Sequence, residues 1–383
     1  MKVAGLFAGI GGLETGLAEA GHETVLLCEI WEPARAVLKR RMLGVPCHQD
    51  ICRLTAVPSE VELLTAGFPC QDLSQAGMTA GIDGARSGLV GEVFRLLDDR
   101  PVPWVLLENV SFMLQLHGGR AMSRLVEEFE QRGYRWAYRV VNSQSFVPQR
   151  RERVIFVATR TEIDPATVLL TDEAEPQIPP TDLNARAHGF YWTEGVRGLG
   201  WAVDAIPTLK GGSTVGIPSS PAIMLPTGNV ITPDIRDAER LQGFQTDWTE
   251  PAEHVARPSI RWKLVGNAVT VPVAEWLGQR LLAPGESDVQ RDRSLRSDKR
   301  WPRAARFDGS ERHEVQINAF PQWKARTSLT QFLVFPGKPL SVRATKGFLS
   351  RTQRGKLRFP EDFLDRLRAH STRLELGDNR IAA

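Results

Sequence analysis

Short apolar runs alternate with longer segments of helical periodicity over the first 160 residues of the chain. Buried strands are predicted for Lys2–Phe7, Glu23–Glu29, Leu63–Gly67 and Val105–Glu108. Helices are predicted between them, at Leu13–Ala20, Pro33–Arg41, Leu89–Arg100 and Met122–Arg132. This alternation predicts an α/β fold with a doubly wound, mostly parallel sheet. Two further strands, Tyr134–Asn142 and Arg153–Thr159, have no long helix between them and predict an antiparallel pair at one sheet edge.

The pattern changes after residue 160. Prolines, glycines and isolated aromatic residues dominate Glu162–Gly228, which predicts a small irregular or β-rich domain. Helical periodicity returns at Ile235–Leu241 and Pro272–Leu282. Gly285–Arg306 reads as a linker and His313–Ala369 as a small basic appendage. We therefore expect four segments, at residues 1–160, 161–229, 230–284 and 285–383, with the third completing the first domain.

Composition and charge narrow the choice of partner. The chain has 383 residues, 42% hydrophobic and 24% charged, as in ordinary globular proteins. No apolar run reaches the roughly 18 residues of a membrane span, so no membrane partner is expected. Gly285–Ala383 holds 21 Lys/Arg against 12 Asp/Glu, whereas the preceding 284 residues hold 27 against 33. Such a basic segment suggests a polyanionic partner, although a solvated basic surface is the simpler alternative.

The cysteines give no metal site. Cys28, Cys47, Cys52 and Cys70 form no CxxC pair. Cys47 and Cys52 lack further Cys or His neighbours at zinc-binding spacing, so no metal is predicted. We expect structural thiols at the first three positions and a reduced, cytoplasmic environment.

A glycine turn follows the first strand, in Phe7-Ala8-Gly9-Ile10-Gly11-Gly12. Glycines there permit a tight turn and close approach of a ligand to the backbone. Glu29 ends the next strand, where a carboxylate suits ribose hydroxyls. Asp50, near the third strand, could accept an adenine amino group. These features fit a dinucleotide dehydrogenase almost as well as a methyltransferase, and glycines needed only for packing remain an alternative.

Cys70 lies just beyond the carboxyl end of a buried strand, in Phe68-Pro69-Cys70-Gln71. Open α/β sheets bind their ligands there, and Pro69 stiffens the turn. A lone cysteine is more often a small buried apolar residue than a nucleophile. The glycine-rich segment Ser74–Gly88 that follows has little to bury, which suits a mobile lid.

Two further motifs carry charged side chains. Glu108 ends a buried strand, where partial desolvation favours a proton-donating carboxyl group. In PQRRERV, alternation places Gln149, Arg151 and Arg153 on one face of an extended segment, as an anion site would require. Ion pairs with no catalytic role explain either motif alone.

The order of these motifs is more specific than any one of them. FAGIGG, Glu29, Asp50, GFPCQ, ENV, QRRER, RLQGF (Arg240–Phe244) and VGNAV (Val265–Val269) follow in sequence. This order resembles the DNA cytosine C5-methyltransferases, over about residues 1–160 and 230–283. The resemblance implies a Rossmann-like fold that binds S-adenosyl-L-methionine (AdoMet) and releases S-adenosyl-L-homocysteine.

The resemblance also implies roles for individual residues. Cys70 matches the family's nucleophile, Glu108 its acidic partner, and Arg151 and Arg153 its active-site arginines. The cofactor pocket would be formed by Phe7, Gly9, Gly11, Glu29, Asp50, Ile51, Phe68, Pro69, Leu89, Asn267, Ala268 and Val269. Either Ile30 or Trp31 would cover the adenine, since the aromatic residue stands one position later than in the family pattern. Residues 162–228 match the variable target-recognition region, in which Thr208-Leu209 resembles a recurrent dipeptide.

The implied substrate is a cytosine flipped out of double-stranded DNA. Candidate DNA contacts are Gln71, Ser74, Gln149, Arg186, Arg197, Thr208, Lys210 and Gly211. A tRNA methyltransferase shares the catalytic motifs, but its Cys-Phe-Thr signature is absent, because no cysteine follows Cys70. A non-catalytic relative would usually have lost the nucleophile or Glu108. We expect a cytoplasmic, nucleoid-associated monomer, with companion restriction or phage-defence proteins as candidate partners.

Overall fold

The computed structural model describes residues 1–68, 88–212, 220–295 and 300–377. These residues form two compact units, each assembled from separate stretches of the chain. The first unit comprises Met1–Asn142, Glu152–Glu175 and Val269–Gln322, and the second comprises Ser143–Arg151, Pro176–Ala268 and Trp323–Ala383. Within the described ranges, no helix combines the length and apolarity that crossing a membrane requires.

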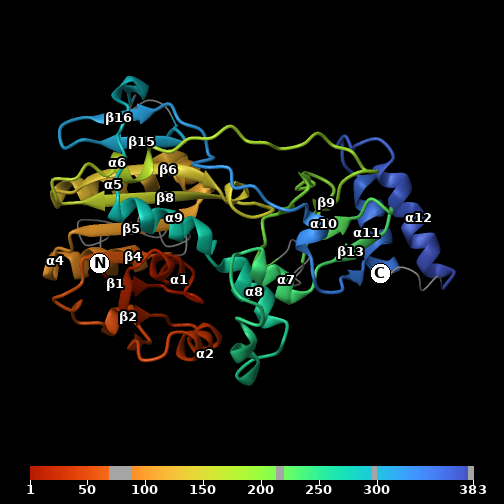
Figure 1. Ribbon diagram of the computed structural model, residues 1–383, viewed down its shortest axis with the longest axis horizontal. Coiled ribbons are helices and arrows are strands. Elements are labelled where there is room, and N and C mark those ends of the chain that lie inside the picture. Colours follow the sequence, from red (N-terminus) through yellow and green to blue (C-terminus); the bar gives the residue numbers. More distant parts are fainter. Residues whose placement is uncertain (69–87, 213–219, 296–299, 378–383) are drawn as a thin grey trace. The chain divides into compact units, whose positions relative to one another are not determined.

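A ten-stranded sheet forms the centre of the first unit, in the order β14-β16-β15-β6-β8-β5-β4-β1-β2-β3 (Figure 1). Its strands are β1 Lys2–Leu6, β2 Glu23–Cys28, β3 Cys47–His48, β4 Leu63–Ala66, β5 Trp104–Val110, β6 Arg135–Asn142, β8 Glu152–Thr159, β14 Asp292–Ser294, β15 Ala304–Phe307 and β16 Arg312–Val315. The strands from β5 to β3 are parallel, and those from β8 to β14 are antiparallel to their neighbours. The predicted α/β class is confirmed.

The chain reverses its direction of travel across this sheet beside β1. It runs outward from β1 through β2 to β3, and then returns to place β4 on the other side of β1, followed by β5. The carboxyl ends of β1 and β4 therefore meet at a topological switch point. This is the place where open α/β sheets bind ligands.

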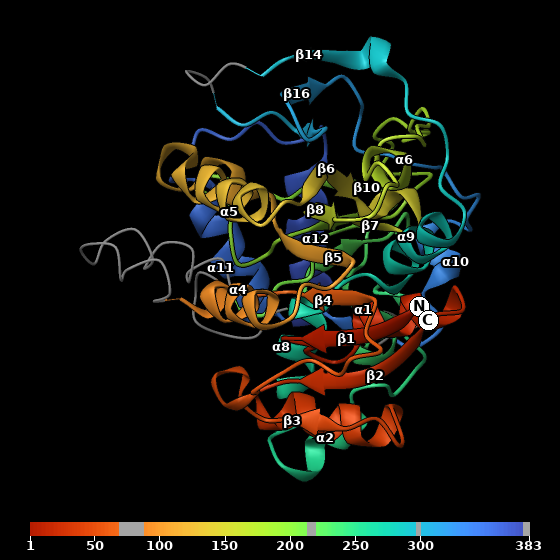
Figure 2. The same ribbon diagram turned by 90° about the vertical axis from the view of Figure 1, so that its left-hand side faces the viewer.

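Helices cover both faces of the sheet. They are α1 Gly12–Glu19, α2 Glu32–Arg41, α4 Leu89–Asp99, α5 Arg120–Gln131, α6 Ala166–Leu169 and α9 Val271–Leu282, with 3₁₀ turns η1 Ile51–Arg53, η3 Ser111–Gly119 and η6 Val289–Arg291. Figure 2 shows α4 and α5 on one face and α1 and α9 on the other. The apolar sides of α4 and α5 pack onto the sheet in one large core that includes Phe94, Phe129 and Trp136.

The contact between α1 and α9 requires glycine. A Cβ atom at Gly16 would lie 2.3 Å from the Val271 carbonyl oxygen and 2.6 Å from the Glu275 amide nitrogen. A Cβ atom at Gly12 would lie 2.5 Å from the Val269 carbonyl oxygen. These neighbours are backbone atoms, so they cannot rotate away.

We expect Gly16→Ala to lower the free energy of unfolding by about 1–3 kcal/mol, because overpacking moves α1 away from α9. Urea denaturation would measure the change. Gly347→Ala is the matched control, since Gly347 also lies in a helix and its Cβ would meet only the flexible end of Arg351, at 3.4 Å. The control should be neutral or stabilising by up to about 1 kcal/mol. Equal effects of the two substitutions would contradict the packing argument.

The C-terminal part of the first unit differs from the expected linker. Strands β14, β15 and β16 lie in the range 292–315 and extend the large sheet. The predicted antiparallel pairing of β6 and β8 is confirmed. Their predicted place at the sheet edge is wrong, because β15 pairs with the other side of β6. Phe307 stacks on Trp136 with ring centroids 6.3 Å apart. Few apolar residues mark these short strands, which is why the sequence pattern did not reveal them.

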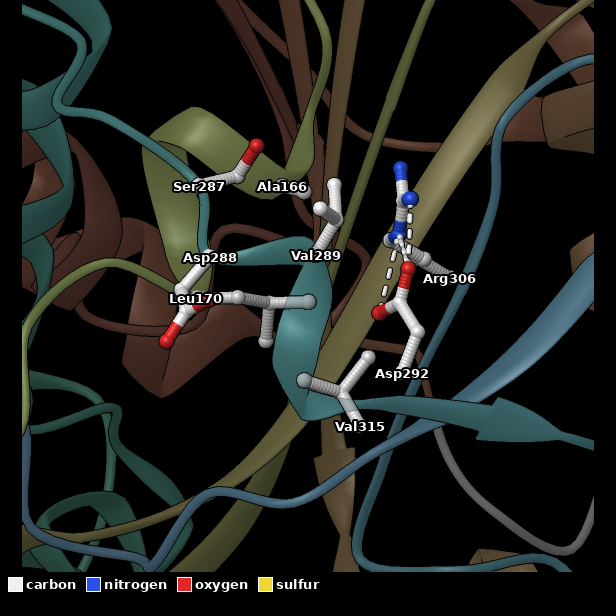
Figure 3. Close-up of a pocket in the computed structure, with 8 residues that line it drawn as sticks. All are labelled: Ala166, Leu170, Ser287, Asp288, Val289, Asp292, Arg306 and Val315. Atoms are coloured by element: carbon white, nitrogen blue, oxygen red, sulfur yellow. Dashed lines mark hydrogen bonds and ion pairs between the residues drawn. The ribbon is translucent and has the colours of Figure 1, made fainter.

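Arg306 lies within β15, where two carboxylates neutralise its charge. Its guanidinium group pairs with Asp292 at 2.6 Å (Figure 3). It also pairs with Asp164 at 3.0 Å. Beside this pair, apolar side chains that include Leu170 and Val315 enclose a cavity of about 10 Å³. That is room for roughly one water molecule.

The second unit contains a five-stranded sheet in the order β10-β9-β12-β13-β17 and a small parallel pair, β11-β7. The strands are β7 Gln149–Arg150, β9 His188–Phe190, β10 Ala202–Val203, β11 Ile206–Pro207, β12 Ala222–Met224, β13 Val230–Thr232 and β17 Lys338–Pro339. The helices are α7 Ile235–Arg240, α8 Ile260–Asn267, α10 Leu329–Phe332, α11 Val342–Thr352 and α12 Phe363–Glu375, with 3₁₀ turns η4 Ser143–Ser145 and η5 Glu250–His254.

The end of the chain forms part of the core of the second unit. Phe348 of α11 and Phe363 of α12 are fully buried against Phe190 of β9. Their ring centroids lie 5.4 and 5.1 Å from that of Phe190. Residues 323–377 therefore complete this unit and do not form a separate appendage.

Candidate active site

Three of the predicted motifs meet at the switch point of the first unit. Phe7 follows β1, Gly67 follows β4 and Glu108 lies in β5, and these strands are neighbours in the sheet. A Cβ atom at Gly67 would lie 3.8 Å from Oε2 of Glu108 and 3.9 Å from the carbonyl oxygen of Phe7. The loops predicted to bind the cofactor and to perform the chemistry therefore begin within contact of one another.

The glycine turn after β1 has a left-handed backbone, and its glycines have different surroundings. Phe7, Gly9 and Gly11 have φ values of 53°, 57° and 84°, in the left-handed region that favours glycine. A Cβ atom at Gly9 would meet nothing within 4 Å, so the backbone there faces open space. A Cβ atom at Gly11 would lie 2.7 Å from the Met42 side chain and 3.2 Å from that of Leu38. Packing therefore accounts for glycine at position 11, whereas the approach of a ligand at Gly9 stays a prediction.

The Glu29 carboxylate is held directly beside this turn. It accepts hydrogen bonds from the backbone amides of Gly9 at 2.8 Å and Trp31 at 2.7 Å. Burial raises the pKa of Glu29, while these hydrogen bonds act in the opposite direction. Of the two candidates to cover an adenine, Ile30 is 70% exposed and Trp31 is half-buried at the start of α2.

The remaining predicted cofactor residues of the first unit lie near the same strand ends. Asp50 follows β3, the neighbour of β2, and accepts a hydrogen bond from the Cys52 amide at 2.9 Å. Ile51 is buried, and Leu89 is half-buried at the start of α4. Phe7, Glu29 and Asp50 thus follow three adjacent parallel strands. No group of three or more His, Cys, Asp or Glu side chains in the described ranges is arranged to hold a metal ion.

Glu14 is a buried acidic residue that the sequence analysis did not single out. It lies in α1, is 1% exposed and accepts a hydrogen bond from the Thr65 hydroxyl at 2.8 Å. Its other carboxyl oxygen is buried without a hydrogen bond. Burial, followed in weight by smaller effects that include the nearby Glu29 charge, raises the pKa of Glu14 from 4.5 to about 7.

This raised pKa predicts a pH-dependent stability. In the unfolded chain Glu14 ionises near pH 4.5, whereas in the folded protein it stays protonated up to about pH 7. Stability is therefore highest below that window and falls as the pH rises through it. A pKa difference of one corresponds to about 1.4 kcal/mol, so Glu14→Gln should stabilise the protein by roughly 3 kcal/mol at pH 8 and by little at pH 4.5. Urea denaturation of both proteins across pH 4.5–8 tests this, and parallel pH curves would contradict it.

Glu108 forms a buried ion pair with Arg153. Its Oε1 lies 2.9 Å from Arg153 Nε, and the two side chains are 10% and 16% exposed. β5 and β8 pair so that Val110 lies opposite Arg153, which places Glu108 and Arg153 diagonally on one face of the sheet. The structure thus brings together two of the four residues predicted to be catalytic.

Asn109 fixes the end of the segment that leads to Cys70. Its side-chain amide donates a hydrogen bond to the carbonyl oxygen of Phe68 at 3.0 Å, and both residues are buried. The sequence analysis assigned Asn109 no role, although it stands inside the ENV motif. Cys70, Pro69, Gln71, Ser74 and the rest of the predicted lid up to residue 87 lie outside the described residues.

Arg151 and Gln149 occupy different surroundings from Arg153. Arg151 is 1% exposed and donates hydrogen bonds to the carbonyl oxygens of Leu209, Gly266 and Ala268, at 3.0, 3.2 and 2.7 Å. Gln149 is fully buried and hydrogen-bonds the Leu209 amide at 2.9 Å. Alternation predicted that Gln149, Arg151 and Arg153 share one anion-binding face. In the structure, Gln149 and Arg151 instead bind backbone groups of the second unit.

The other predicted DNA contacts in the second unit fall into two groups. Thr208, Lys210 and Gly211 lie in one segment, and Arg186 and Arg197 lie outside it. Thr208 donates to the Arg150 carbonyl at 2.9 Å, and a Cβ atom at Gly211 would lie 2.4 Å from the amide oxygen of exposed Asn267. Lys210 pairs with Glu194 at 2.6 Å and lies 3.7 Å above the Tyr191 ring. These residues adjoin one another through the Thr208–Gly211 segment. Arg197 is exposed and Arg186 half-buried, outside that contact.

Comparison with known proteins identifies the family. A profile described as C-5 cytosine-specific DNA methylase matches residues 1–189. The Type II methyltransferase M2.BsuMI of Bacillus subtilis is 44% identical over 385 residues, covering 96% of this chain and 97% of its own length. The Type II methyltransferase M.PspPI of Psychrobacter is 37% identical over 163 residues, covering 41% of this chain and 39% of its own.

A solved structure supports the fold alone. The crystal structure of the S. pombe Dnmt2 methyltransferase aligns with a TM-score of 0.55 at 18% identity, covering 74% of this chain and 98% of that one. The 44% identity to a Type II methyltransferase extends over nearly the full length of both chains, and the predicted motifs converge at the switch point of the sheet. The chain belongs to the C-5 cytosine-specific DNA methylase family and is a DNA cytosine-5 methyltransferase.

Proposed function

We propose that this enzyme transfers a methyl group from AdoMet to carbon 5 of a cytosine flipped out of a specific double-stranded DNA sequence. The proposal rests on the arrangement at the switch point, where Phe7 and Gly67 follow the neighbouring strands β1 and β4 and Glu108 lies in the next strand, β5. A cofactor-binding turn, the segment leading to Cys70 and an acidic residue would thereby serve one site. The relative M2.BsuMI, named as a Type II methyltransferase, supports the DNA substrate.

The residues after β1, β2 and β3 fit AdoMet. The open space at Gly9 allows a ligand to approach the backbone. Glu29 is oriented by two backbone amides and keeps lone pairs for ribose hydroxyls. Asp50 and Ile51 follow on the next strand, where an adenine would lie. AdoMet would supply an electrophilic methyl group at this place.

Cys70 and Glu108 would activate the cytosine. Carbon 5 is a poor nucleophile until a thiolate adds to carbon 6, which makes the ring electron-rich. Cys70 would form that bond, and Glu108 would hydrogen-bond ring nitrogen 3 and the exocyclic amine. Arg153, paired with Glu108, would hold the carboxylate in position. After methylation, loss of the carbon-5 proton and release of Cys70 would restore the ring.

Base-resolution methylation sequencing tests the proposal. The protein would be expressed in a bacterial host that lacks DNA methylation, and genomic DNA would be sequenced. We expect 5-methylcytosine in one sequence context. Absence of methylation from well-folded protein would overturn the DNA assignment and direct the same assay to tRNA.

The expected cytoplasmic location, monomeric state and companion restriction or defence proteins stay predictions.

A further inference from the structure

The second unit carries a line of exposed basic side chains at residues 354–358. Arg354, Lys356 and Arg358 are exposed, whereas the residues that alternate with them are half-buried. Phe359, which follows, stacks on buried Phe363 with ring centroids 5.9 Å apart. Arg354 lies in the turn that follows α11, and the exposure of all three side chains shows that they face solvent. We call these three residues the basic strip.

The basic strip adjoins the loop in which sequence analysis placed DNA contacts. A Cβ atom at Gly355 would lie 2.7 Å from the Val196 carbonyl oxygen and 3.0 Å from its Cα. Arg351 donates to the backbone carbonyls of Glu194 at 3.0 Å and Trp192 at 2.6 Å. Arg354 and Lys356 therefore flank the point where the strip meets the loop.

Exposed Arg197 comes next to Val196 in that loop and brings a fourth cation to the same place. Burial, and then the charge of Arg354, lower the pKa of Arg351, the side chain that binds this loop. Several cations are thus present where the C-terminal segment contacts the loop that contains Val196 and Arg197.

Carboxylates elsewhere on this unit are paired with other cations. Glu194 pairs with Lys210, Asp365 with Arg368 and Glu375 with Lys346. Glu361 and Asp362 follow the strip in sequence. In the described part of the chain, no ion pair within 4.0 Å joins a carboxylate to any of the three cations of the strip. Uncompensated cations on an exposed segment fit a polyanion that supplies the missing charge.

We infer that the basic strip, with Arg197, binds backbone phosphates of the DNA duplex beside the target site. This inference rests on the proposed function and extends it to the C-terminal segment. Phosphate contacts position a protein on DNA and strengthen binding without reading its sequence. The strip should therefore raise affinity equally for target and unrelated duplexes.

The test removes charge without removing structure. Truncation would not serve, because residues 292–377 supply three strands of the large sheet and the core helices α11 and α12. The variant is Arg354→Gln/Lys356→Gln, and the matched control is Lys346→Gln/Arg368→Gln. The control removes the same charge from the same unit at cations that are exposed and already paired. Affinity for target and unrelated duplexes would be measured at several salt concentrations between about 50 and 300 mM, the range over which phosphate contacts weaken.

For the strip variant we expect the slope of log affinity against log salt to fall by about 2, or roughly 0.9 per phosphate contact. At about 0.1 M salt this corresponds to a loss of roughly 10- to 100-fold on both duplexes. The methylated sequence and AdoMet affinity should stay unchanged, and the control should lose less than about twofold.

An unchanged slope, or an equal loss in the control, would overturn the inference. A changed target sequence would also overturn it, because the strip would then read bases. Loss of binding to RNA or an acidic protein alone would assign the strip to that partner. Wild-type protein that neither binds nor methylates DNA would instead refute the proposed function.

Discussion

Replacing Cys70 by alanine is expected to abolish methyl transfer while leaving AdoMet binding intact. Without the thiolate, carbon 6 is not attacked and carbon 5 stays unreactive, so we expect a loss of roughly 10⁴-fold or more in kcat. The predicted cofactor residues Phe7, Glu29 and Asp50 follow β1, β2 and β3, whereas Cys70 comes after β4 in the sequence. Methylation of a duplex with radiolabelled AdoMet measures the first effect, and calorimetric titration of AdoMet measures the second.

Cys52→Ala is the control for the loss of a thiol. Cys52 is exposed and lies in the first unit, so its removal should leave turnover within about twofold of wild type. Measurable turnover by the Cys70 variant at a substantial fraction of the wild-type rate would contradict its assignment as nucleophile. Loss of AdoMet binding in that variant would instead place Cys70 in the cofactor pocket.

Glu108→Gln is expected to lower kcat by roughly 10²–10³-fold, because an amide cannot share a proton with ring nitrogen 3. The amide preserves the size of the side chain at this buried position, so AdoMet affinity should stay unchanged. Steady-state kinetics on a duplex that contains the target sequence measures the effect. Near wild-type turnover would show that Glu108 only maintains the ion pair with Arg153.

A double-mutant cycle separates the role of Arg153 from that of Glu108. If Arg153 acts by orienting Glu108, Arg153→Ala in the Glu108→Gln background should cost little further activity. Independent contact between Arg153 and the substrate would make the two losses multiply. The single Arg153→Ala variant should also be less stable, because it leaves the Glu108 carboxylate buried without its partner at 2.9 Å.

Much of the first unit could be predicted because its signals are local. β1, β2, β4 and β5 are buried runs bounded by turns, and the helices between them have clear periodicity. The motifs also lie where such a sheet binds ligands, so Phe7, Glu29 and Glu108 could be predicted as site residues from the sequence. Phe7, Gly67 and Glu108 come together because β1, β4 and β5 are neighbours in the sheet, an order that short apolar runs do not encode by themselves.

The roles of buried polar residues were harder to predict. Gln149, Arg151 and Arg153 alternate in sequence, yet the first two bind backbone groups of the second unit and the third pairs with Glu108. Periodicity gives the direction of a side chain but not its partner. The partners of Arg151 come from residues 209, 266 and 268, and only folding brings these together.

The sequence by itself determined the family, the α/β class and the order of the catalytic motifs, because these are written in contiguous residues. Tertiary structure alone decided the place of residues 285–377. They contribute β14, β15 and β16 to one sheet and α11 and α12 to the core of the second unit. Their short strands are held by long-range pairing with β6, and their helices by Phe190, so the stabilising contacts are distant in sequence. The local pattern of this segment is dominated by arginine, so without knowledge of those partners it predicts a linker and an appendage.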